Sequence, residues 1–568
     1  GYSTDVTAAD IPDVLAFKRV GAKVLEDGRL QLTLADSMPY FASVLTYSCF
    51  LPMNAKFVEE VGYANFGTTK DKFLYNGAYR LTAWNEGEIA YKKNPDYWDA
   101  AKVHVEDVHY TLVSGDIGYD YTRSKFESGA IDGFTVSQND TVGWGKYVAG
   151  EDNSGTLENP ASDDAYSRFV EGVDSSFFMM FNMNRDETST AAEQSSELTD
   201  DEIANTNRAI KLDAVREILF KGIDLNVYNE RYGTSKVYQE MYQIHTYTPR
   251  NFAIDSANDK DYVDYIYEQY AEKYGGTAAE AEAKLRPGQI AGSFVSATEL
   301  EPLRTKATAA ITAYNAANLA GFETDIALPV KVEYLGLSFD DDNRENDTKW
   351  IENANERING CTINSSHISA SLPACSGGAF PTIQIVNNEK APDSEFYSNM
   401  GSAGFYNMYI MGWGPDYADP LTYLNTLVTN GDMSGYTGTT EEVTTFSVVG
   451  GVLTPGTLLG EFDALVNDAK VVNDDIAQRY TKFAKAEVEL LFETNLIRPL
   501  YNLGQGWRVT VTKTISYQKP TATYGLSENK LKGMWVMVNT VGADKRIEMK
   551  SYYDNLKANL DPNYSIYA

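Results

Sequence analysis

The sequence predicts a mixed α/β fold in which helices cover the sheets, and three observations support this prediction. Short apolar runs of strand length recur along the chain, as in FFMMFNM at 177–183 and TIQIV at 382–386. Longer segments with apolar residues at helical spacing lie between them, as at 474–491. The chain has 568 residues, enough for three or four structural units or for two large lobes. Alternation of strands and amphipathic helices is typical of α/β chains.

The N-terminal part predicts short elements with recognisable boundary signals. Residues 77–93 contain two alternating runs separated by Asn85-Glu86-Gly87, a pattern that predicts a hairpin. Gly62 and Gly129 suit helix C-caps because glycine adopts the left-handed conformation without strain. The other expected elements are a strand at 29–36, a helical turn from Pro39 to about Pro52, a helix at 57–62, a strand at 105–113, a helix at 121–132 and a short strand around Phe134.

The rest of the chain predicts longer helices and more strongly apolar strands. Residues 177–183 are apolar almost throughout, so we expect a central strand that is buried on both faces. RAIKLDAVREILFK at 208–221 predicts one amphipathic helix. The other expected elements are helices at about 258–283 and 297–318, a strand at 329–337, an acidic loop at 340–347 before a helix at 348–358, strands at 382–386 and 406–413, a loop or short hairpin at 434–457, a helix at 474–491 with Asp474 or Asp475 as N-cap, and a strand at 496–503.

Charge and hydropathy exclude several classes of partner. The formal net charge is −32, so the surface repels phosphate backbones and anionic lipid, and we expect no nucleic-acid partner. No apolar run reaches 18 residues, so we expect no membrane span. The first residues, GYSTDVTAAD, are polar and do not form a signal peptide.

The three cysteines carry information about the compartment. Cys361 and Cys375 flank the loop TINSSHISASLPA, and a disulfide that closes this loop would favour an extracytoplasmic location. The alternative for this pair is two free thiols. Cys49 lies between Tyr47 and Phe50, where we expect a small buried apolar side chain.

Motifs for catalysis or metal binding do not stand out. The four histidines form no HExxH pattern, and we expect His104 and His109 at the surface. The run Asp340-Asp341-Asp342 lacks the Gly and Glu of an EF-hand loop, so we expect a solvated turn. The sequence also lacks a G-x-x-x-x-G-K-[ST] loop and a G-x-S-x-G elbow. We therefore expect no cofactor and no enzymatic activity.

Several segments, in this order along the chain, are similar to the motifs of one protein family. They are MPYFASVLTYSCFLPMNAKFVEEVG at 38–62, YNGAYRLTAWNEGEIAYKKNPDYWDAAKVHVEDVHY at 75–110, YTRSKFESGAIDGF at 121–134, FFMMFNMNR at 177–185, LDAVREILFKGID at 212–224 and GWGPDYADPLTYL at 412–424. The set resembles the extracytoplasmic solute-binding proteins of peptide-type ABC importers, the oligopeptide/dipeptide-binding family of bacterial lipoproteins. The resemblance covers most of the chain, from about Gly21 to Met537.

The resemblance implies a two-lobe fold of the periplasmic-binding-protein type, class II, with a hinge near Phe177–Phe181 and near Pro499–Tyr501. Lobe one would comprise residues 1–176 plus 500–568. Lobe two would comprise 177–499, with insertions near 236–325 and 361–375. The N-terminal portion of the family's lobe one has no counterpart here, so a second chain or a further segment would supply it.

The resemblance also implies a ligand site around the motif GWGPDYADPLTYL. In oligopeptide-binding relatives the Asp at the position of Asp416 pairs with the ligand's α-ammonium, and the Trp at the position of Trp413 lines the cleft. A carboxylate in a closed cleft favours a cation, and Trp adds a π face. The alternatives are a turn-forming Asp416 that caps the helix starting near Pro420 and a Trp413 that packs in the core. The further cleft candidates, for several of which core packing is equally expected, are Tyr417, Phe178, Phe181 and Tyr501. Some relatives carry an Arg at the position of Ile410, so ligand specificity is expected to differ.

The function that the resemblance implies is that of a non-catalytic receptor. It would bind short peptides between the lobes, close by hinge motion and deliver them to an ABC permease in the membrane. The protein would be extracytoplasmic and anchored to lipid through an N-terminal segment that is not present here. The alternatives are an oligosaccharide or a metal chelate as ligand of the same fold, or a surface hydrolase or adhesin.

Overall fold

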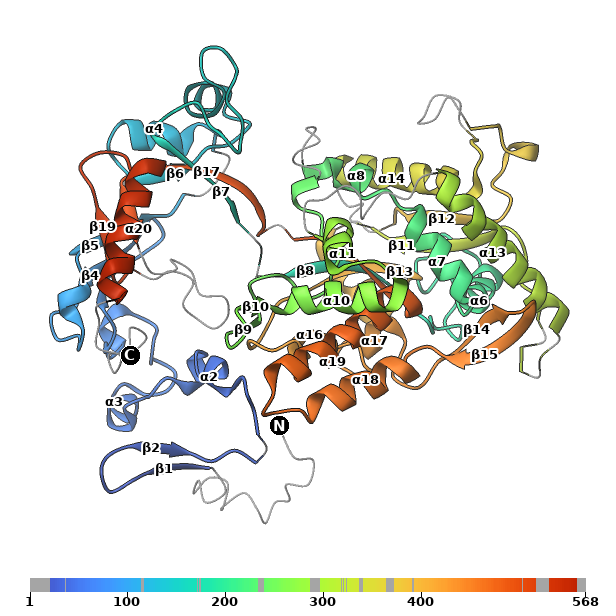
Figure 1. Ribbon diagram of the computed structural model, residues 1–568, viewed down its shortest axis with the longest axis horizontal. Helices are drawn as coiled ribbons and strands as arrows, with labels where there is room; N and C mark the ends of the chain where they lie inside the picture. Colours follow the sequence, from blue (N-terminus) through green and yellow to red (C-terminus); the bar gives the residue numbers. More distant parts are fainter. Residues whose placement is uncertain are drawn as a thin grey trace.

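A computed structural model describes residues 21–35, 37–113, 117–170, 172, 175–232, 240–286, 297–317, 319, 321–322, 324–336, 341–363, 372–390, 393–502, 504–516 and 531–558. Figure 1 shows two α/β lobes, with lobe two at the right. Lobe two is built from the chain between β8 (Ser176–Phe181) and β16 (Ile497–Tyr501), and lobe one from the chain before and after it. The two-lobe α/β prediction is confirmed.

Lobe two is organised around one five-stranded sheet. The strand order is β12 (Ile383–Asn388), β11 (Val330–Leu335), β13 (Met408–Trp413), β8 and β16. β8 is antiparallel to both of its neighbours, whereas β11 is parallel to β12 and β13. Phe178, Met179, Met180 and Phe181 have no exposed surface, so the prediction of a central strand buried on both faces is confirmed.

Helices cover this sheet and complete the large core of lobe two. They include α6 (Asp200–Ala209), α7 (Asp213–Gly222), α10 (Tyr262–Tyr274), α11 (Ala278–Leu285), α13 (Ala297–Ala317), α14 (Asp341–Asn359), α18 (Gly460–Lys470) and α19 (Ile476–Glu489). α6 packs on β11, and α14 packs on β12. Asp475 caps α19 by accepting a hydrogen bond from the Gln478 N–H, as predicted. The segment 434–457 forms α17 (Ser434–Thr437) and the hairpin of β14 (Thr444–Val449) and β15 (Val452–Thr457).

The prediction of a single helix at 208–221 is wrong. α6 ends at Ala209 and α7 begins at Asp213, because the chain turns between them and Leu212 bridges to Phe446. The buried Arg216 stabilises the break, since its guanidinium donates to the Ile210 carbonyl at 2.7 Å and to the Asp213 carboxylate at 2.7 Å. The apolar residues of 208–221 keep their helical spacing across this turn, so the sequence pattern did not indicate a break. The helix expected over 258–283 is similarly divided into α10 and α11 by Gly275 and Gly276, both at positive φ.

The prediction of an acidic loop before the helix at 348–358 is also wrong for the described residues. α14 already begins at Asp341, and Asp340 lies outside the described residues. Acidic residues favour a helix N-terminus because its unpaired N–H groups are partly positive. Asp347 is fully buried, where it accepts hydrogen bonds from Arg231 at 2.8 Å and from the Trp350 indole at 2.9 Å.

Lobe one consists of small sheets and short helices. The expected hairpin is formed by β3 (Tyr79–Trp84) and β4 (Glu88–Lys93), and Gly62 and Gly129 adopt positive φ at helix ends as predicted. The other strands are β1 (Ala22–Val24), β2 (Leu30–Leu32), β5 (Asp107–Thr111), β6 (Gly133–Thr135), β7 (Ala165–Val170), β17 (Gly506–Thr512), β18 (Thr514–Ser516) and β19 (Met534–Val536). The helices include α2 (Phe41–Val44), α3 (Ala55–Val61), α4 (Tyr121–Glu127), α5 (Thr141–Trp144) and α20 (Ala543–Ala558).

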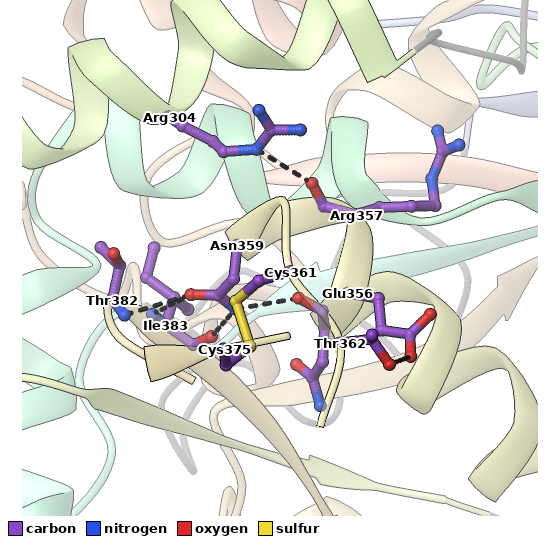
Figure 2. The surroundings of a disulfide bond; sticks show 10 residues. Arg304, Glu356, Arg357, Asn359, Cys361, Thr362, Cys375, Thr382 and Ile383 are labelled. Atoms are coloured by element: carbon purple, nitrogen blue, oxygen red, sulfur yellow. Dashed lines mark hydrogen bonds between the residues drawn. A yellow bond between two sulfur atoms is a disulfide. The ribbon is translucent and has the colours of Figure 1, made fainter. Parts of the chain in front are cut away.

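A disulfide joins Cys361 and Cys375, as predicted (Figure 2). It lies where α14 ends beside the edge strand β12. Asn359 ties the helix end to that strand, because its side-chain oxygen accepts from the Thr382 and Ile383 N–H groups. Residues 364–371 of the bridged loop, and parts of the expected insertion near 236–325, lie outside the described residues. Cys49 is exposed, so the prediction that it is buried is wrong; it lies in a short turn whose neighbour Phe50 is also exposed.

Removing the disulfide by a Cys361→Ser/Cys375→Ser double substitution is expected to lower the free energy of unfolding by about 2–3 kcal/mol. A crosslink restricts the unfolded chain, and closure of a loop of this size corresponds to roughly that gain. Urea unfolding of the variant and of the parent protein measures the difference. The exposed Cys49→Ser is the matched control and is expected to leave stability unchanged. Equal stability of parent and double variant would contradict the prediction.

A carboxylate that has no cationic partner among the described residues lies in the core of lobe two. Glu487 of α19 is fully buried and accepts hydrogen bonds from the Tyr247 and Thr248 N–H groups and from the Thr248 and Tyr262 hydroxyls. Burial raises the pKa of Glu487 to about 7, although these hydrogen bonds act in the opposite direction. The folded state therefore binds a proton here that the unfolded chain has already released above about pH 4.5.

Glu487 is expected to make the protein less stable as pH rises from about 4.5 to about 7, with a slope of up to about 1.4 kcal/mol per pH unit. The loss is complete above the folded-state pKa. Glu487→Gln imitates the protonated form, so its stability relative to the parent should be greater at pH 7.5 than at pH 5. Urea unfolding at both pH values measures this change, and an identical difference at the two pH values would disprove it.

Candidate ligand-binding site

The motif at 412–424 lies at the carboxyl edge of the lobe-two sheet. β13 ends at Trp413, the chain forms a loop over 414–420, and the short helix α16 (Leu421–Leu424) follows. The carboxyl ends of β11, β12, β13 and β16 share this edge because only β8 runs in the opposite direction. Ligands of open α/β sheets bind outside the carboxyl ends of strands, so the loop lies in a favourable place for binding.

A buried ion pair stabilises this loop. Asp419 and Arg479 are each 1% exposed, and two nitrogens of the guanidinium donate to the two carboxylate oxygens at 2.8 Å. Arg479 also donates to the carbonyls that end α18, at Ala469, Lys470 and Val472. The Asp419 carboxylate accepts a hydrogen bond at 3.1 Å from the N–H of Leu421, the first residue of α16. This contact leaves the side chain of Asp416 available for another role.

Asp416 is exposed and has no ion-pair partner among the residues that the structure describes. Its backbone N–H donates to the Thr422 hydroxyl at 3.0 Å, which fixes the loop around it. Partial burial raises the pKa of Asp416, the Asp432 carboxylate raises it further, and a hydrogen bond from the Tyr47 hydroxyl opposes both effects. Because the Asp432 carboxylate is near and no cation pairs with Asp416 in the described residues, this carboxylate is suited to bind a cation from outside the chain.

A segment of lobe one covers the same loop. The Tyr40 ring stacks on the Tyr417 ring, with centroids 4.2 Å apart and planes inclined by 13°. The Ser43 hydroxyl accepts the Ala418 N–H at 3.0 Å, and the Tyr47 hydroxyl donates to the Pro415 carbonyl at 3.4 Å. Sequence reasoning did not identify these residues as part of the site. Tyr47 lies beyond the end of α2 (Phe41–Val44), so no helical spacing in the sequence linked these three residues to the loop.

Trp413 is half-buried and packs against the core of lobe two. Its indole N–H is shielded from solvent and has no acceptor in the described part of the chain. Its register partner on β8 is Ser176, whose hydroxyl is also buried and unpaired in that part. The ring therefore combines core packing with an unsatisfied donor at the sheet edge.

The remaining candidates divide between core and edge. Phe178 and Phe181 contact Tyr247 and Phe220 at centroid distances of 5.0 and 4.5 Å, and neither has exposed surface. The structure places both in the core because β8 is covered on both of its faces. Tyr501 is 6% exposed and stacks on the half-buried Phe177 at 4.8 Å. Phe177, which sequence reasoning did not select, is thus the phenylalanine of β8 that reaches the sheet edge.

The described part of the chain offers neither a metal site nor a membrane-spanning helix. No group of three or more His, Cys, Asp and Glu side chains there could hold a metal ion. His104 stacks on Trp535 at 3.7 Å, and the exposed His109 contacts Glu88 at 2.8 Å; His367 lies outside the described residues. None of the helices found in those residues combines the length and apolar character needed to cross a bilayer.

Comparison with solved structures yields peptide-binding proteins, at low similarity. Listeria monocytogenes OppA bound to peptide aligns with a TM-score of 0.48 and 18% identity, over 93% of this chain and 78% of the other. Haemophilus influenzae OppA in complex with RPPGFSPFR aligns with a TM-score of 0.46 and 15% identity, over 93% and 78%.

Comparison with curated sequences and family models gives the classification. The oligopeptide-binding protein AliB of Streptococcus pneumoniae is 24% identical over 526 residues, which cover 90% of this chain and 69% of AliB. AmiA of the same species is 24% identical over 487 residues, which cover 84% of this chain and 64% of AmiA. The model of the bacterial extracellular solute-binding proteins, family 5, middle region, matches residues 4–309, more than half of the chain. The chain therefore belongs to family 5 of the bacterial extracellular solute-binding proteins.

Proposed function

We propose that this protein is the extracytoplasmic substrate-binding component of an ABC importer and that it binds short peptides between its lobes. The observation that carries the proposal is the state of Asp416, an exposed carboxylate at the carboxyl edge of the sheet without a cationic partner in the described residues. Its family membership and the names of the relatives, which are oligopeptide-binding proteins, support the same class of ligand.

In this proposal the peptide's α-ammonium pairs with Asp416. The Tyr47 hydroxyl already hydrogen-bonds this carboxylate, and the stacked rings of Tyr40 and Tyr417 form a wall beside it. Contacts from both lobes therefore meet at the position of the ammonium. Closure removes water and strengthens the charge-assisted hydrogen bond. The rest of the peptide lies extended and bonds through its backbone, which permits many side chains.

We further propose that the lobes, with residues 1–176 plus 500–568 in one and 177–499 in the other, rotate about the two crossing segments. Gly172 and Asn502 belong to these segments and lie in contact, since a Cβ at residue 172 would come within 2.3 Å of the Asn502 side-chain oxygen. The Gln505 amide donates to the carbonyls of Met241 and Gln243, at 2.6 and 2.9 Å, and anchors the second crossing to lobe two. Rotation about such short segments is the usual form of hinge closure.

The importer's permease subunits would be the membrane partners, and an N-terminal lipid anchor would hold the protein at the outer face. A further segment or chain would complete lobe one. The three-stranded sheet β6–β17–β7 supports this part of the proposal, because both of its outer strands have one edge without a strand neighbour in the described residues.

Mass spectrometry of small molecules released by denaturing the purified protein tests the proposal. We expect a mixture of short peptides, and we expect added peptides to be recovered intact after incubation, because no hydrolysis is proposed. N-acetylation of a bound peptide removes its positive charge and should abolish the tight binding. Release of an oligosaccharide or a metal chelate would be compatible with the same fold but would contradict the proposal that the ligand is a peptide. Cleavage of the added peptide would favour a hydrolase.

A further inference from the structure

The sheet β6–β17–β7 of lobe one has two faces of opposite character. One face buries Phe134, Ala165, Val509 and Val511 in the small core of the lobe. The alternate residues point to the other face, which carries threonine hydroxyls, an aromatic ring and cations. In register, Thr510 faces both Tyr166 and Thr135, and Arg508 faces Arg168. A polar outer face is ordinary for an antiparallel sheet, but this pairing of arginines is not.

Arg508 and Arg168 are thus cross-strand neighbours on this face. Like charges directly opposite each other destabilise a sheet, because the Cβ atoms of such a pair are only about 5 Å apart. Arg168 is exposed, and no described residue forms an ion pair or a hydrogen bond with its side chain. The chain as a whole carries a formal charge of −32, so a group of arginines on one face is contrary to its composition.

A third guanidinium reaches the same face from helix α20. Arg546 lies over the Tyr166 ring at 4.3 Å, and its Nε donates to the Val541 carbonyl at 3.3 Å. Burial lowers the pKa of Arg546, and the positive charge of Arg168 contributes in the same direction, while Tyr166 opposes it. The two cations therefore lie close enough to repel each other, with neither neutralised by an ion pair in the described residues.

A hollow of about 430 Å³ opens beside these groups. Arg168, Arg546 and Tyr166 line it together with the hydroxyl-bearing residues Thr135, Thr510, Thr512 and Thr514. Asp132 is the acidic residue in the described lining, and its carbonyl accepts the Thr512 hydroxyl at 3.0 Å. The lining of the hollow therefore combines two guanidinium groups with several threonine hydroxyls.

The geometry points to a second binding site in this hollow, for a small multivalent oxyanion or carboxylate such as phosphate or citrate. Planar guanidinium groups bind the paired oxygens of phosphate and carboxylate with two parallel hydrogen bonds. A bound anion would neutralise Arg168 and Arg546 and relieve their mutual repulsion. The site is built from β6, β7, β17 and α20, none of which contributes to the loop around Asp416.

Isothermal titration calorimetry at low ionic strength with inorganic phosphate and with citrate tests the site. We expect saturable binding by the full chain, and a dissociation constant about tenfold higher for Arg168→Gln and for Arg546→Gln, since each removes one charged fork. Arg29→Gln is the matched control, because Arg29 is exposed and paired with Asp27 away from the hollow. It should bind like the parent protein.

Thermal unfolding separates binding from folding. Without anion, Arg168→Gln should unfold at a temperature about 1 °C higher than the parent, because the repulsion between Arg168 and Arg546 is gone. Phosphate or citrate should raise the unfolding temperature of the parent by more than that of Arg168→Gln. Absence of saturable binding, or an equal loss in Arg29→Gln, would overturn the proposal. Binding of a Glu-rich peptide but of neither small anion would also overturn it and would assign the face to an acidic polypeptide.

Discussion

Asp416→Asn is expected to weaken the binding of a short peptide about a thousandfold, equivalent to about 4 kcal/mol. The substitution retains the shape of the side chain and removes the charge that would pair with the peptide's α-ammonium. The loop should keep its structure, because Asp419 and Thr422 hold it through contacts that do not use the Asp416 side chain. Calorimetric titration of the parent and the variant with one peptide measures the loss.

The matched control is Asp432→Asn, which removes a neighbouring negative charge. Asp432 raises the pKa of Asp416 without being its proposed partner for the ligand, so this variant should retain affinity within about threefold. N-acetylated peptide should bind the parent and Asp416→Asn equally weakly. Retention of full affinity by Asp416→Asn would reject the ammonium assignment.

The same carboxylate predicts how peptide binding depends on pH. The pKa of Asp416 is raised chiefly by partial burial, and protonation removes the charge that binds the ammonium. Affinity should therefore be full above this pKa and should fall as pH decreases through it. In Asp416→Asn this acid-side loss should be absent, which titrations between pH 3 and 7 would show. A parent protein with constant affinity over this range would contradict the prediction.

Arg479→Met is expected to lower the free energy of unfolding by about 3–5 kcal/mol, the largest effect on stability that we predict. Asp419 would remain buried as a carboxylate without its cation, and the carbonyls at the end of α18 would lose their donor. The loop that carries Asp416 would lose its support, so peptide affinity should fall as well. Urea unfolding and peptide titration of the same preparations measure the two losses.

Two further variants test whether the loss of stability comes from breaking this ion pair. Arg344→Met removes a half-buried arginine of α14 that pairs with the exposed Asp341, and it should change stability by less than about 0.5 kcal/mol. Asp419→Asn combined with Arg479→Met removes both charges, so it should be more stable than Arg479→Met alone. If the single variant were as stable as the parent, the ion pair would not support the loop.

Local patterns in the sequence predicted most of the individual elements. The hairpin at 77–93, the capping of α19 by Asp475 and the central strand at 177–183 follow from spacing and composition, which act over a few residues. The errors arose where distant contacts decide the outcome. Leu212 lies in the break of the expected helix and bridges to Phe446, and Asp347 of α14 is buried against Arg231, which is more than 100 residues away.

The site was only partly predictable for the same reason. The sequence motif placed Trp413, Asp416 and Tyr417 together because they are neighbours in the chain. The covering residues Tyr40 and Tyr47 come from a segment more than 300 residues away, and no local pattern links them to the loop. Phe178 and Phe177 are adjacent in one strand, and only the stacking of Tyr501 on Phe177 shows which of the two reaches the edge.

The pairing of β8 with β16 has a consequence for the order in which the chain is made. β8 is synthesised early, whereas its outer neighbour comes after all the rest of lobe two. The sheet therefore cannot be completed while the chain is still growing through lobe two, and contacts this distant in sequence form slowly. A chain truncated just before Ile497 would contain four of the five strands and nearly the whole core. It would nevertheless present β8 as an open edge, which favours aggregation over folding.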